Sequence, residues 1–158
     1  MNSLSGADDL INKLNTLGAE MKTTIVKKAV GKAAQRVRAE AVLLCPVDKG
    51  ELRQSIKTSV EASGYEVTGT TYTNKEYASY VEFGTGPMGQ ENHSGISTEI
   101  TPTYSAQGWS YKDDNGEWIY TNGQAAQPFM YPALKNNESR VKKIIKEEIA
   151  SDIGKLVD

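Results

Sequence analysis

The sequence has very few residues that could bind a metal or form a covalent cross-link. It contains one cysteine, Cys45, and one histidine, His93, in 158 residues. A single cysteine cannot form a disulfide within the chain, and one cysteine with one histidine cannot supply the four ligands of a structural zinc site. We therefore expect no internal disulfide, no metal site and no cofactor.

Long apolar runs are also missing. No stretch reaches the roughly 20 consecutive apolar residues of a membrane-spanning helix. Residues 1–9 carry two acids and no basic, apolar leader, so no signal peptide is expected either. A chain of 158 residues with 38% hydrophobic residues fits one globular domain, and we predict a single domain over residues 1–158.

The charges are unevenly distributed along the chain. The net charge is -2, but residues 1–58 hold 10 bases and 6 acids, residues 59–127 hold 2 and 9, and residues 128–158 hold 6 and 5. A basic first part and an acidic middle can complement copies of the same chain or differently charged neighbours. This asymmetry indicates association without naming a partner.

Helical periodicity appears at both ends of the chain. Apolar residues recur every three or four positions from Leu10 to Leu44, which predicts a helix with a break near Gly18. On this pattern Val30, Val37 and Leu44 face the core. Residues 46–50 have turn chemistry, and a second apolar stripe over 134–156, with a proline near its start, predicts a final helix.

Two β-hairpins are predicted between these helices. Alternating β-rich residues on either side of 62–64 form the first, and the aromatic segments 108–112 and 117–121 around an Asn-Gly step form the second. For residues 77–83 a helical turn and a strand both fit. Residues 86–103 are rich in glycine and proline, so we expect a flexible loop there that becomes ordered only against a neighbour, followed by a hairpin insertion over 104–125.

No pattern in the sequence indicates catalysis. Residues 84–89 formally match G-x-G-x-x-G, but Pro87 lacks a backbone N–H, no helix pattern follows and no βα unit precedes, so we interpret the segment as a glycine turn. Residues 113–116 lack acids at the positions that a calcium loop needs. Cys45 has no histidine near it in sequence. Glu82, between aromatic residues, is expected to make a structural contact.

Six bases and no acid occur between Lys22 and Arg38. On a helical wheel Lys28, Lys32 and Arg36 line one flank of the apolar stripe. Three readings are open: a solvated helix face, a surface for an acidic protein or another copy of the chain, and a surface for nucleic acid. Motifs that read or stack on bases are absent.

Three segments together resemble one protein family. They are CPVDKGELRQSI at 45–56, YASYVEFGTG at 77–86 and QPFMYPAL at 127–134. Their order and spacing are similar to those of the tail-completion, or head–tail joining, proteins of tailed bacteriophages and prophages, the gene-product-ten family of minor tail components. The chain departs from the family at Lys49, where Thr or Ser is usual, and in a variable stretch over 88–125.

The resemblance implies an α+β fold, in which an antiparallel sheet is flanked by a long N-terminal helix and a C-terminal helix. It implies a non-enzymatic virion protein of the neck or tail, present in the host cytoplasm during assembly, that forms a ring, commonly a hexamer. Implied partners are other copies, the head connector or stopper protein and the tail tube or tail terminator, with DNA only passing through and no membrane. The alternative function is a DNA-contacting packaging or connector accessory that uses the basic helix 22–38.

Several residues are expected to form interaction surfaces in such a protein. They come from the flank of the basic helix and from two of the three resembling segments. The set is Lys28, Lys32, Arg36, Tyr77, Tyr80, Glu82, Phe83, Gly84, Thr85, Gly86, Pro128 and Phe129.

Overall fold

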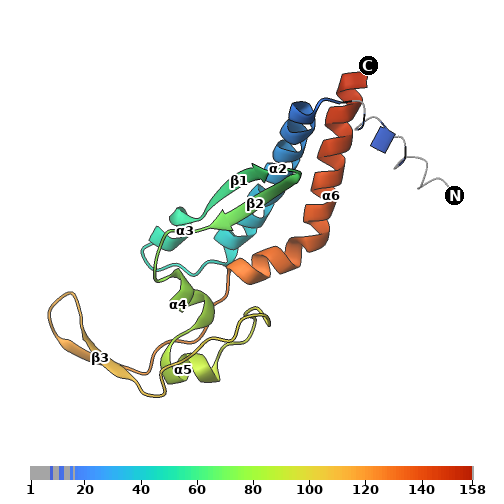
Figure 1. The fold of residues 1–158 in the computed structure, drawn as a ribbon. Helices are drawn as coiled ribbons and strands as arrows, with labels where there is room; N and C mark the ends of the chain where they lie inside the picture. Colours follow the sequence, from blue (N-terminus) through green and yellow to red (C-terminus); the bar gives the residue numbers. More distant parts are fainter. Residues whose placement is uncertain (1–7, 9–10, 13–14, 16, 158) are drawn as a thin grey trace. The chain divides into compact units, whose positions relative to one another are not determined.

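The computed structural model describes residues 8, 11–12, 15 and 17–157, with side chains up to residue 155. These residues have the predicted α+β fold class (Figure 1). The chain forms two compact units, which we describe separately. The first comprises residues up to 38, 57–71 and from 137 on, and the second comprises 39–56 and 72–136. A single domain over 1–158 stays a prediction, and the start of the predicted first helix lies largely outside the described residues.

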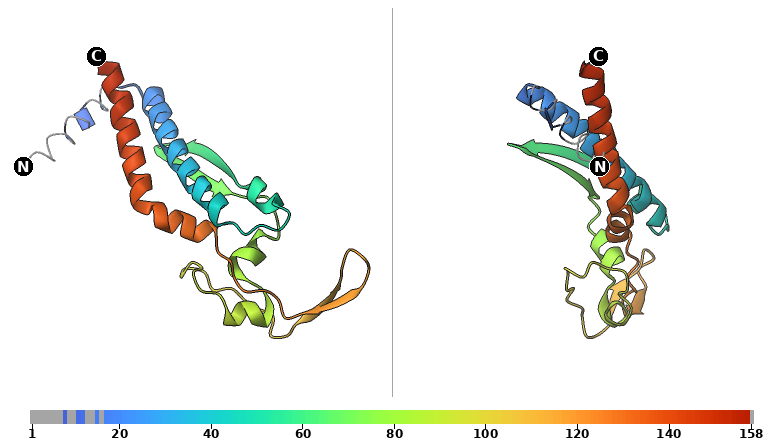
Figure 2. Two further views of the ribbon diagram at one scale, coloured as in Figure 1. Left: turned by 180° about the vertical axis from the view of Figure 1, so that it is seen from behind. Right: turned by 90° about the vertical axis from the view of Figure 1, so that its right-hand side faces the viewer.

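The first unit contains a two-stranded sheet and the greater part of two long helices. Helix α2 (Ala19–Leu44) and helix α6 (Met130–Val157) lie side by side in Figures 1 and 2. Strands β1 (Lys57–Ser63) and β2 (Glu66–Tyr72) form the predicted hairpin, which turns at Gly64 with φ +58°. Both long helices and this hairpin follow the sequence prediction.

The β1–β2 hairpin packs closely on α2. A Cβ atom added to Gly69 would lie 2.7 Å from Val30 Cγ1, so the absence of a side chain permits this approach. Thr71 Oγ1 donates to the Ala34 carbonyl at 3.3 Å. Hydrogen bonds and packing between strand and helix therefore build this part of the core.

Apart from Ala34, the buried residues of α2 follow a four-residue spacing. Val37 is buried as predicted, with 7% exposure, and Val30 is half-buried, but Leu44 is 40% exposed, so its predicted core position is wrong. A helix turns about 100° per residue, so a row with four-residue steps advances about 40° per step around the axis. By the end of α2 the buried row has moved to another face, on which Leu44 does not lie. The row is Ile25, Ala29, Ala33, Val37, Ala41 and, just beyond the helix, Cys45.

The second unit contains three short helices. Helix α3 (Glu51–Ser55) follows the predicted turn, helix α4 (Ala78–Phe83) decides the open choice over 77–83, and helix α5 (Gly86–Glu91) lies in the segment predicted as a loop. The expected loop is therefore wrong over residues 86–91, where α5 begins inside the glycine motif. Helices of five or six residues span fewer than two turns, so they cannot show the apolar repeat from which a helix is predicted.

The second predicted hairpin is also present. Strands β3 (Trp109–Lys112) and β4 (Trp118–Thr121) pair antiparallel, with Trp109 opposite Thr121 and Lys112 opposite Trp118. At the turn, Asp113 Oδ1 accepts hydrogen bonds from the N–H groups of Asn115 and Glu117, each at 2.9 Å, and Gly116 has φ +83°. The turn chemistry read from the sequence therefore produces this hairpin.

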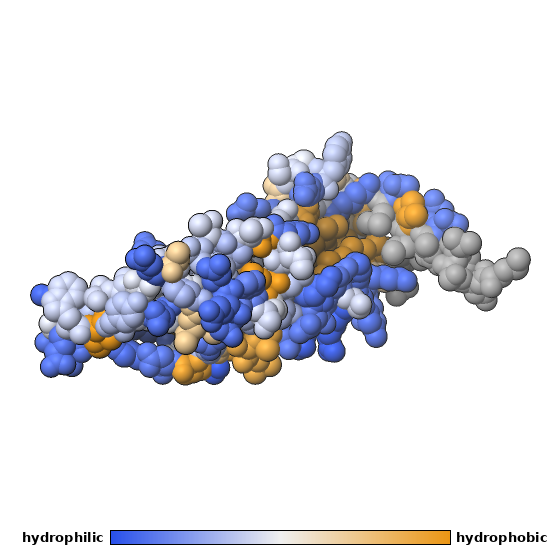
Figure 3. All heavy atoms as spheres, turned by 90° about the horizontal axis from the view of Figure 1, so that it is seen from below, coloured by the Kyte–Doolittle hydropathy of each residue, from blue (hydrophilic) through white to orange (hydrophobic). Residues whose placement is uncertain are grey.

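On the face shown in Figure 3, strongly apolar residues form small areas separated by polar ones. Within the described part of the chain, none of the helices combines the length and the apolar character required to span a membrane.

Candidate functional site

The three segments that carry the family resemblance all lie in the second unit. Residues 45–56, 77–86 and 127–134 fall within its ranges of 39–56 and 72–136. The second unit therefore contains both kinds of motif residue: those expected to bind partners and those that hold the fold together.

Glu82 connects two of these segments. Its Oε2 accepts hydrogen bonds from the N–H groups of Phe129 and Met130 at 2.8 and 2.9 Å, and its Oε1 accepts one from Tyr131 at 3.0 Å. The next residue, Pro132, has no N–H to satisfy. The first N–H groups of α6, which have no acceptor inside a helix, thus receive a carboxylate that also complements the positive end of the helix dipole.

The structural contact predicted for Glu82 is thereby confirmed. Glu82 is 6% exposed, and Phe129 is fully buried. Both residues were also expected to form interaction surfaces, which stays a prediction. Since they are enclosed in the unit, any such role is indirect, through the position they give to α4 and to the start of α6.

The segment 84–86 crosses 122–126 at very short range. The N–H of Thr85 donates to the Gln124 carbonyl at 2.9 Å, and the Gln124 N–H donates to the Thr85 carbonyl at 3.1 Å. Gly84 and Gly86 have φ +77° and +60°, and a Cβ atom on either would lie less than 3.0 Å from backbone atoms of the crossing segment.

The backbone N–H groups that a nucleotide site would need at this crossing are already hydrogen-bonded within the chain. The N–H groups of Thr85, Met88 and Gly89 donate to the carbonyls of Gln124, Asn122 and Thr85 respectively, at 2.9–3.1 Å. A phosphate would have to displace these bonds. The geometry therefore agrees with the reading of residues 84–89 as a structural glycine turn.

An open groove with aromatic walls lies beside this crossing. Tyr77 and Tyr80, at the start of α4, are 41% and 59% exposed, and together with Tyr104 and Trp109 they line a space of about 720 Å³. The Tyr104 hydroxyl donates to the Phe83 carbonyl at 2.8 Å, and burial raises the pKa of Tyr104 above its usual value.

Sequence reasoning missed the contribution of Tyr104 and Trp109 to this groove. Both come from the variable stretch, more than 20 residues from α4, and no regular spacing relates them to Tyr77 or Tyr80. The only signal was the density of aromatic residues after residue 103, which indicates a surface but not its position.

A second groove adjoins the first. It encloses about 540 Å³, is lined by residues 46–52 together with Tyr77, Val81 and two glutamines, and shares Tyr77 with the aromatic groove. Val47 on its wall is 55% exposed, and Leu43 in the same unit is 73% exposed. The lining of the aromatic groove contains no charged residue, whereas the second groove is lined in part by Asp48, Lys49 and Glu51. The aromatic groove is therefore the one suited to binding an apolar protein surface.

Cys45 in the second unit does not have the environment of an activated nucleophile. Cys45 is 1% exposed, and burial raises the pKa of its thiol, an effect that the nearby Arg53 only partly opposes. A buried thiol of raised pKa is a poor nucleophile at neutral pH. Among the described residues, no three His, Cys, Asp or Glu side chains gather as a metal site would require.

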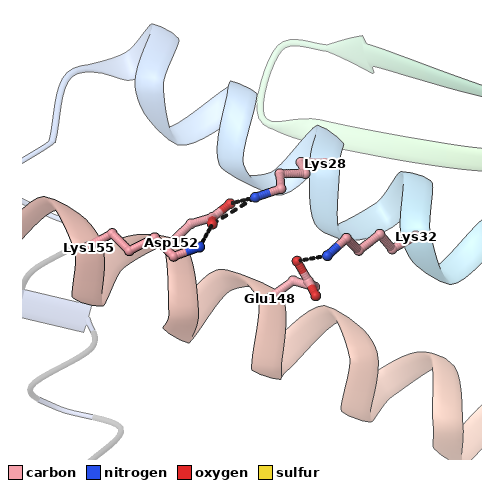
Figure 4. A network of polar contacts seen from close by, with 5 residues as sticks. All are labelled: Lys28, Lys32, Glu148, Asp152 and Lys155. Carbon is pink, nitrogen blue, oxygen red and sulfur yellow. Dashed lines mark hydrogen bonds and ion pairs between the residues drawn. The ribbon is translucent and has the colours of Figure 1, made fainter.

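The basic flank of α2, in the first unit, faces α6. Lys28 Nζ lies 2.7 Å from Asp152 Oδ2, and Lys32 Nζ lies 2.6 Å from Glu148 Oε2 (Figure 4). Arg36 Nε donates to Asn137 Oδ1 at 2.8 Å. The three side chains expected to meet another subunit thus have partners in their own chain, and an interface that uses them has to compete with these contacts.

Comparison with known protein families gives a match to part of the chain. Residues 8–84 match the HK97-gp10-like family model, described as "Bacteriophage HK97-gp10, putative tail-component". No curated protein and no solved structure matches the chain. The matched range includes the segment 45–56 and most of 77–86, and it indicates a structural role in a phage virion. Through residues 8–84 the chain is similar to the HK97-gp10-like family of phage tail components, and the resemblance that its motifs indicated is confirmed.

Proposed function

We propose that this chain is a structural subunit that completes a phage or prophage tail and joins it to the head connector, and that it assembles with copies of itself into a ring without catalysing a reaction. The family match over residues 8–84 is the observation that carries this proposal.

The second unit supports this proposal, because some of its motif residues make internal contacts and others are exposed. The motif residues Glu82, Gly84 and Thr85 make internal contacts, whereas Tyr77 and Tyr80 are exposed beside an open groove. A unit held rigid from within, with aromatic side chains on its surface, is suited to binding other proteins, because tyrosines bury a large area at small entropic cost. Contacts between different patches of identical subunits close into rings when the rotation permits.

The alternative, a DNA-contacting accessory that uses helix 22–38, has less support. Lys28 and Lys32 are already paired with acids of α6, so these two bases are less available to neutralise phosphates. The acids beside them would also repel the DNA backbone.

The proposal is tested by determining the mass of the purified chain in solution and then mixing it with the connector and tail-tube proteins of the same phage. A discrete oligomer, and co-elution with one of these proteins, are expected. A chain that stays monomeric at all concentrations and binds none of them contradicts the proposal. Binding to duplex DNA with a steep salt dependence would favour the accessory role instead.

A further inference from the structure

The β3–β4 hairpin presents aromatic side chains on both of its faces. Trp118 and Tyr120 share one face and are 71% and 64% exposed, while Trp109 and Tyr111 share the other and are 40% and 46% exposed. Seven of the eight strand residues are exposed. A two-stranded hairpin without a covering layer is at best marginally stable, and exposed aromatic surface of this kind usually marks an interface.

The tip and one face of this hairpin are suited to a cationic surface. Three acids, Asp113, Asp114 and Glu117, lie within five residues at the turn. Asp113 stabilises the turn itself, which leaves the exposed Asp114 and Glu117 for a partner. The Trp118 ring already accepts a cation, since Lys112 Nζ lies 5.3 Å from its centroid. Carboxylates at the tip and open ring faces on the stem both favour lysine or arginine.

The same chain carries such a surface on α6. Arg140, Lys143 and Lys146 are exposed and spaced three residues apart, so they form a row that rises about 9 Å along the helix while it turns about 120° around the axis. The Lys143 side chain is 72% exposed and pairs only at 3.7 Å with the exposed Glu147. An exposed pair of this type contributes between about 0 and 1 kcal/mol, so a partner can displace it at little cost.

The charge balance of the two units fits a contact between copies. The first unit, which contains the α6 row, has 13 bases and 10 acids, and the second unit, which contains the hairpin, has 5 bases and 10 acids. The second unit of one molecule is therefore attracted to the first unit of another, and complementary charge both speeds encounter and selects the register.

We infer that the β3–β4 hairpin of one copy docks on the basic row Arg140, Lys143 and Lys146 of α6 in a second copy. The contact joins two different patches, so it is heterologous and repeats from subunit to subunit, as a ring requires. Ion pairs at the tip and cation–π contacts along the stem are individually weak, and several act together. The inference rests on the self-assembly in the proposed function and names the surfaces that would carry it.

The test is a charge-swap series on the full chain, measured by sedimentation velocity at low and moderate salt. The tip variant is Asp114→Lys with Glu117→Lys, which keeps Asp113 and its turn bonds. The helix variant is Arg140→Glu with Lys146→Glu, and a third protein combines all four changes. Glu61→Lys with Glu66→Lys, two exposed positions of the β1–β2 hairpin, is the control with the same change of charge as the tip variant.

We expect the tip variant and the helix variant each to weaken self-association by about ten-fold or more, the combined protein to recover most of it, and the control to resemble the wild type. Circular dichroism verifies that each variant is folded. Failure of the combined protein to recover, or wild-type assembly by either single-surface variant, overturns the inference.

Three further outcomes show which of the two proposals fails. If the wild type does not self-associate but binds the connector or tail-tube protein, the docking inference is wrong while the tail role stands. If the helix variant loses DNA binding and assembles normally, the α6 row is a nucleic-acid surface and the inference is overturned. If the wild type binds neither itself nor those proteins, both fail.

Discussion

Glu82 caps a helix that begins almost 50 residues later in the sequence. A helix is usually capped by its own N-terminal flanking residue, often Ser, Thr, Asp or Asn. Here Phe129 occupies that position and is fully buried, so it adds apolar contact but cannot accept the N–H groups that follow. The carboxylate of Glu82 accepts them instead, at 2.8–3.0 Å, and thereby connects α4 to the start of α6.

Replacing Glu82 by alanine is expected to destabilise the protein by about 3 kcal/mol, because buried N–H groups lose charged acceptors. Glu82→Gln is expected to cost less, since its amide keeps one acceptor oxygen but turns an NH₂ group toward backbone donors. Urea unfolding measures both, and Glu76→Ala, at an exposed position, is the matched control. A change below about 0.5 kcal/mol in Glu82→Ala would show that the cap is not needed.

Gly84 is a second residue whose role depends on a distant segment. Gly84→Ala is expected to lower the free energy of unfolding by about 2–4 kcal/mol, since the added methyl group would lie 2.8 Å from backbone atoms of Gln124 and Ala126 at φ +77°. Gly154→Ala is the control, because nothing lies near its Cβ position in α6, and we expect it to stabilise by about 1 kcal/mol. Equal thermal midpoints for the two variants would contradict the close crossing at Gly84.

At the scale of elements, charged pairs join α2 to α6. Two lysines of α2 meet two acids of α6, and Lys155 also contacts Asp152, at 3.4 Å. The hydrogen bond to Asp152 raises the pKa of Lys28, and the hydrogen bond from Lys28 lowers the pKa of Asp152. Each group is therefore favoured in its charged form when the helices are together.

This pairing predicts how stability depends on pH. A carboxylate whose pKa is lowered by folding adds stability above its unfolded pKa, near 3.9, and the gain is lost as the pH falls through the lower, folded pKa. Asp152→Asn should therefore melt at a lower temperature than the wild type at pH 7, and the difference should shrink as the pH falls below about 4. Glu147→Gln, which removes only an exposed pair at 3.7 Å, is the control. A difference that stays constant down to pH 3 would contradict the pairing.

The segment 86–103 divides into two parts that should differ in amide exchange. The N–H groups of Gly89 and Asn92 donate to carbonyls within and next to α5, at 2.9 and 3.0 Å. Over 94–103 the N–H of Ile100 donates to the Ser97 carbonyl at the longer distance of 3.3 Å. We expect hydrogen exchange of the isolated chain to be slower over 86–92 than over 94–103, with the latter slowed on assembly. Strong protection across 94–103 without a partner would contradict the idea that this part becomes ordered against a neighbour.

At the scale of the whole molecule, the family match covers less of the chain than the contacts that hold the matched segment in place. The match ends at residue 84, the first residue of the glycine crossing. The acceptors and donors that complete this region, at 122–126 and 129–131, lie beyond it, as does α6 with its partners for the basic flank of α2. The matched segment thus depends on residues outside its own range.

We therefore predict that a fragment of residues 1–84 does not fold cooperatively. It lacks α6, so the lysines of α2 and the carboxylate of Glu82 lose their partners, and buried apolar faces become exposed to water. Circular dichroism with thermal melting compares it with the full chain, for which a sharp transition is expected. A sharp transition in the fragment would show that the matched segment folds independently.

The sequence by itself determined those features that depend on neighbouring residues. The turns at Gly64 and at residues 113–116 depend on local φ preferences and on hydrogen bonds of an Asp side chain. The two long helices repeat their apolar pattern over many turns. Both turns and both helices were therefore predictable. The α+β class and the family resemblance followed from these elements and from three short motifs.

Only the tertiary structure decided how these pieces meet. The short helices α3 and α5 are stabilised by contacts rather than by periodicity, and Leu44 is exposed because the buried row of α2 moves around the helix. The cap at Glu82 joins groups 47–49 residues apart, and Tyr104 meets α4 across a variable stretch. Such contacts depend on the path of the whole chain, because hydrogen bonds and packing act through space, and no local spacing in the sequence records them.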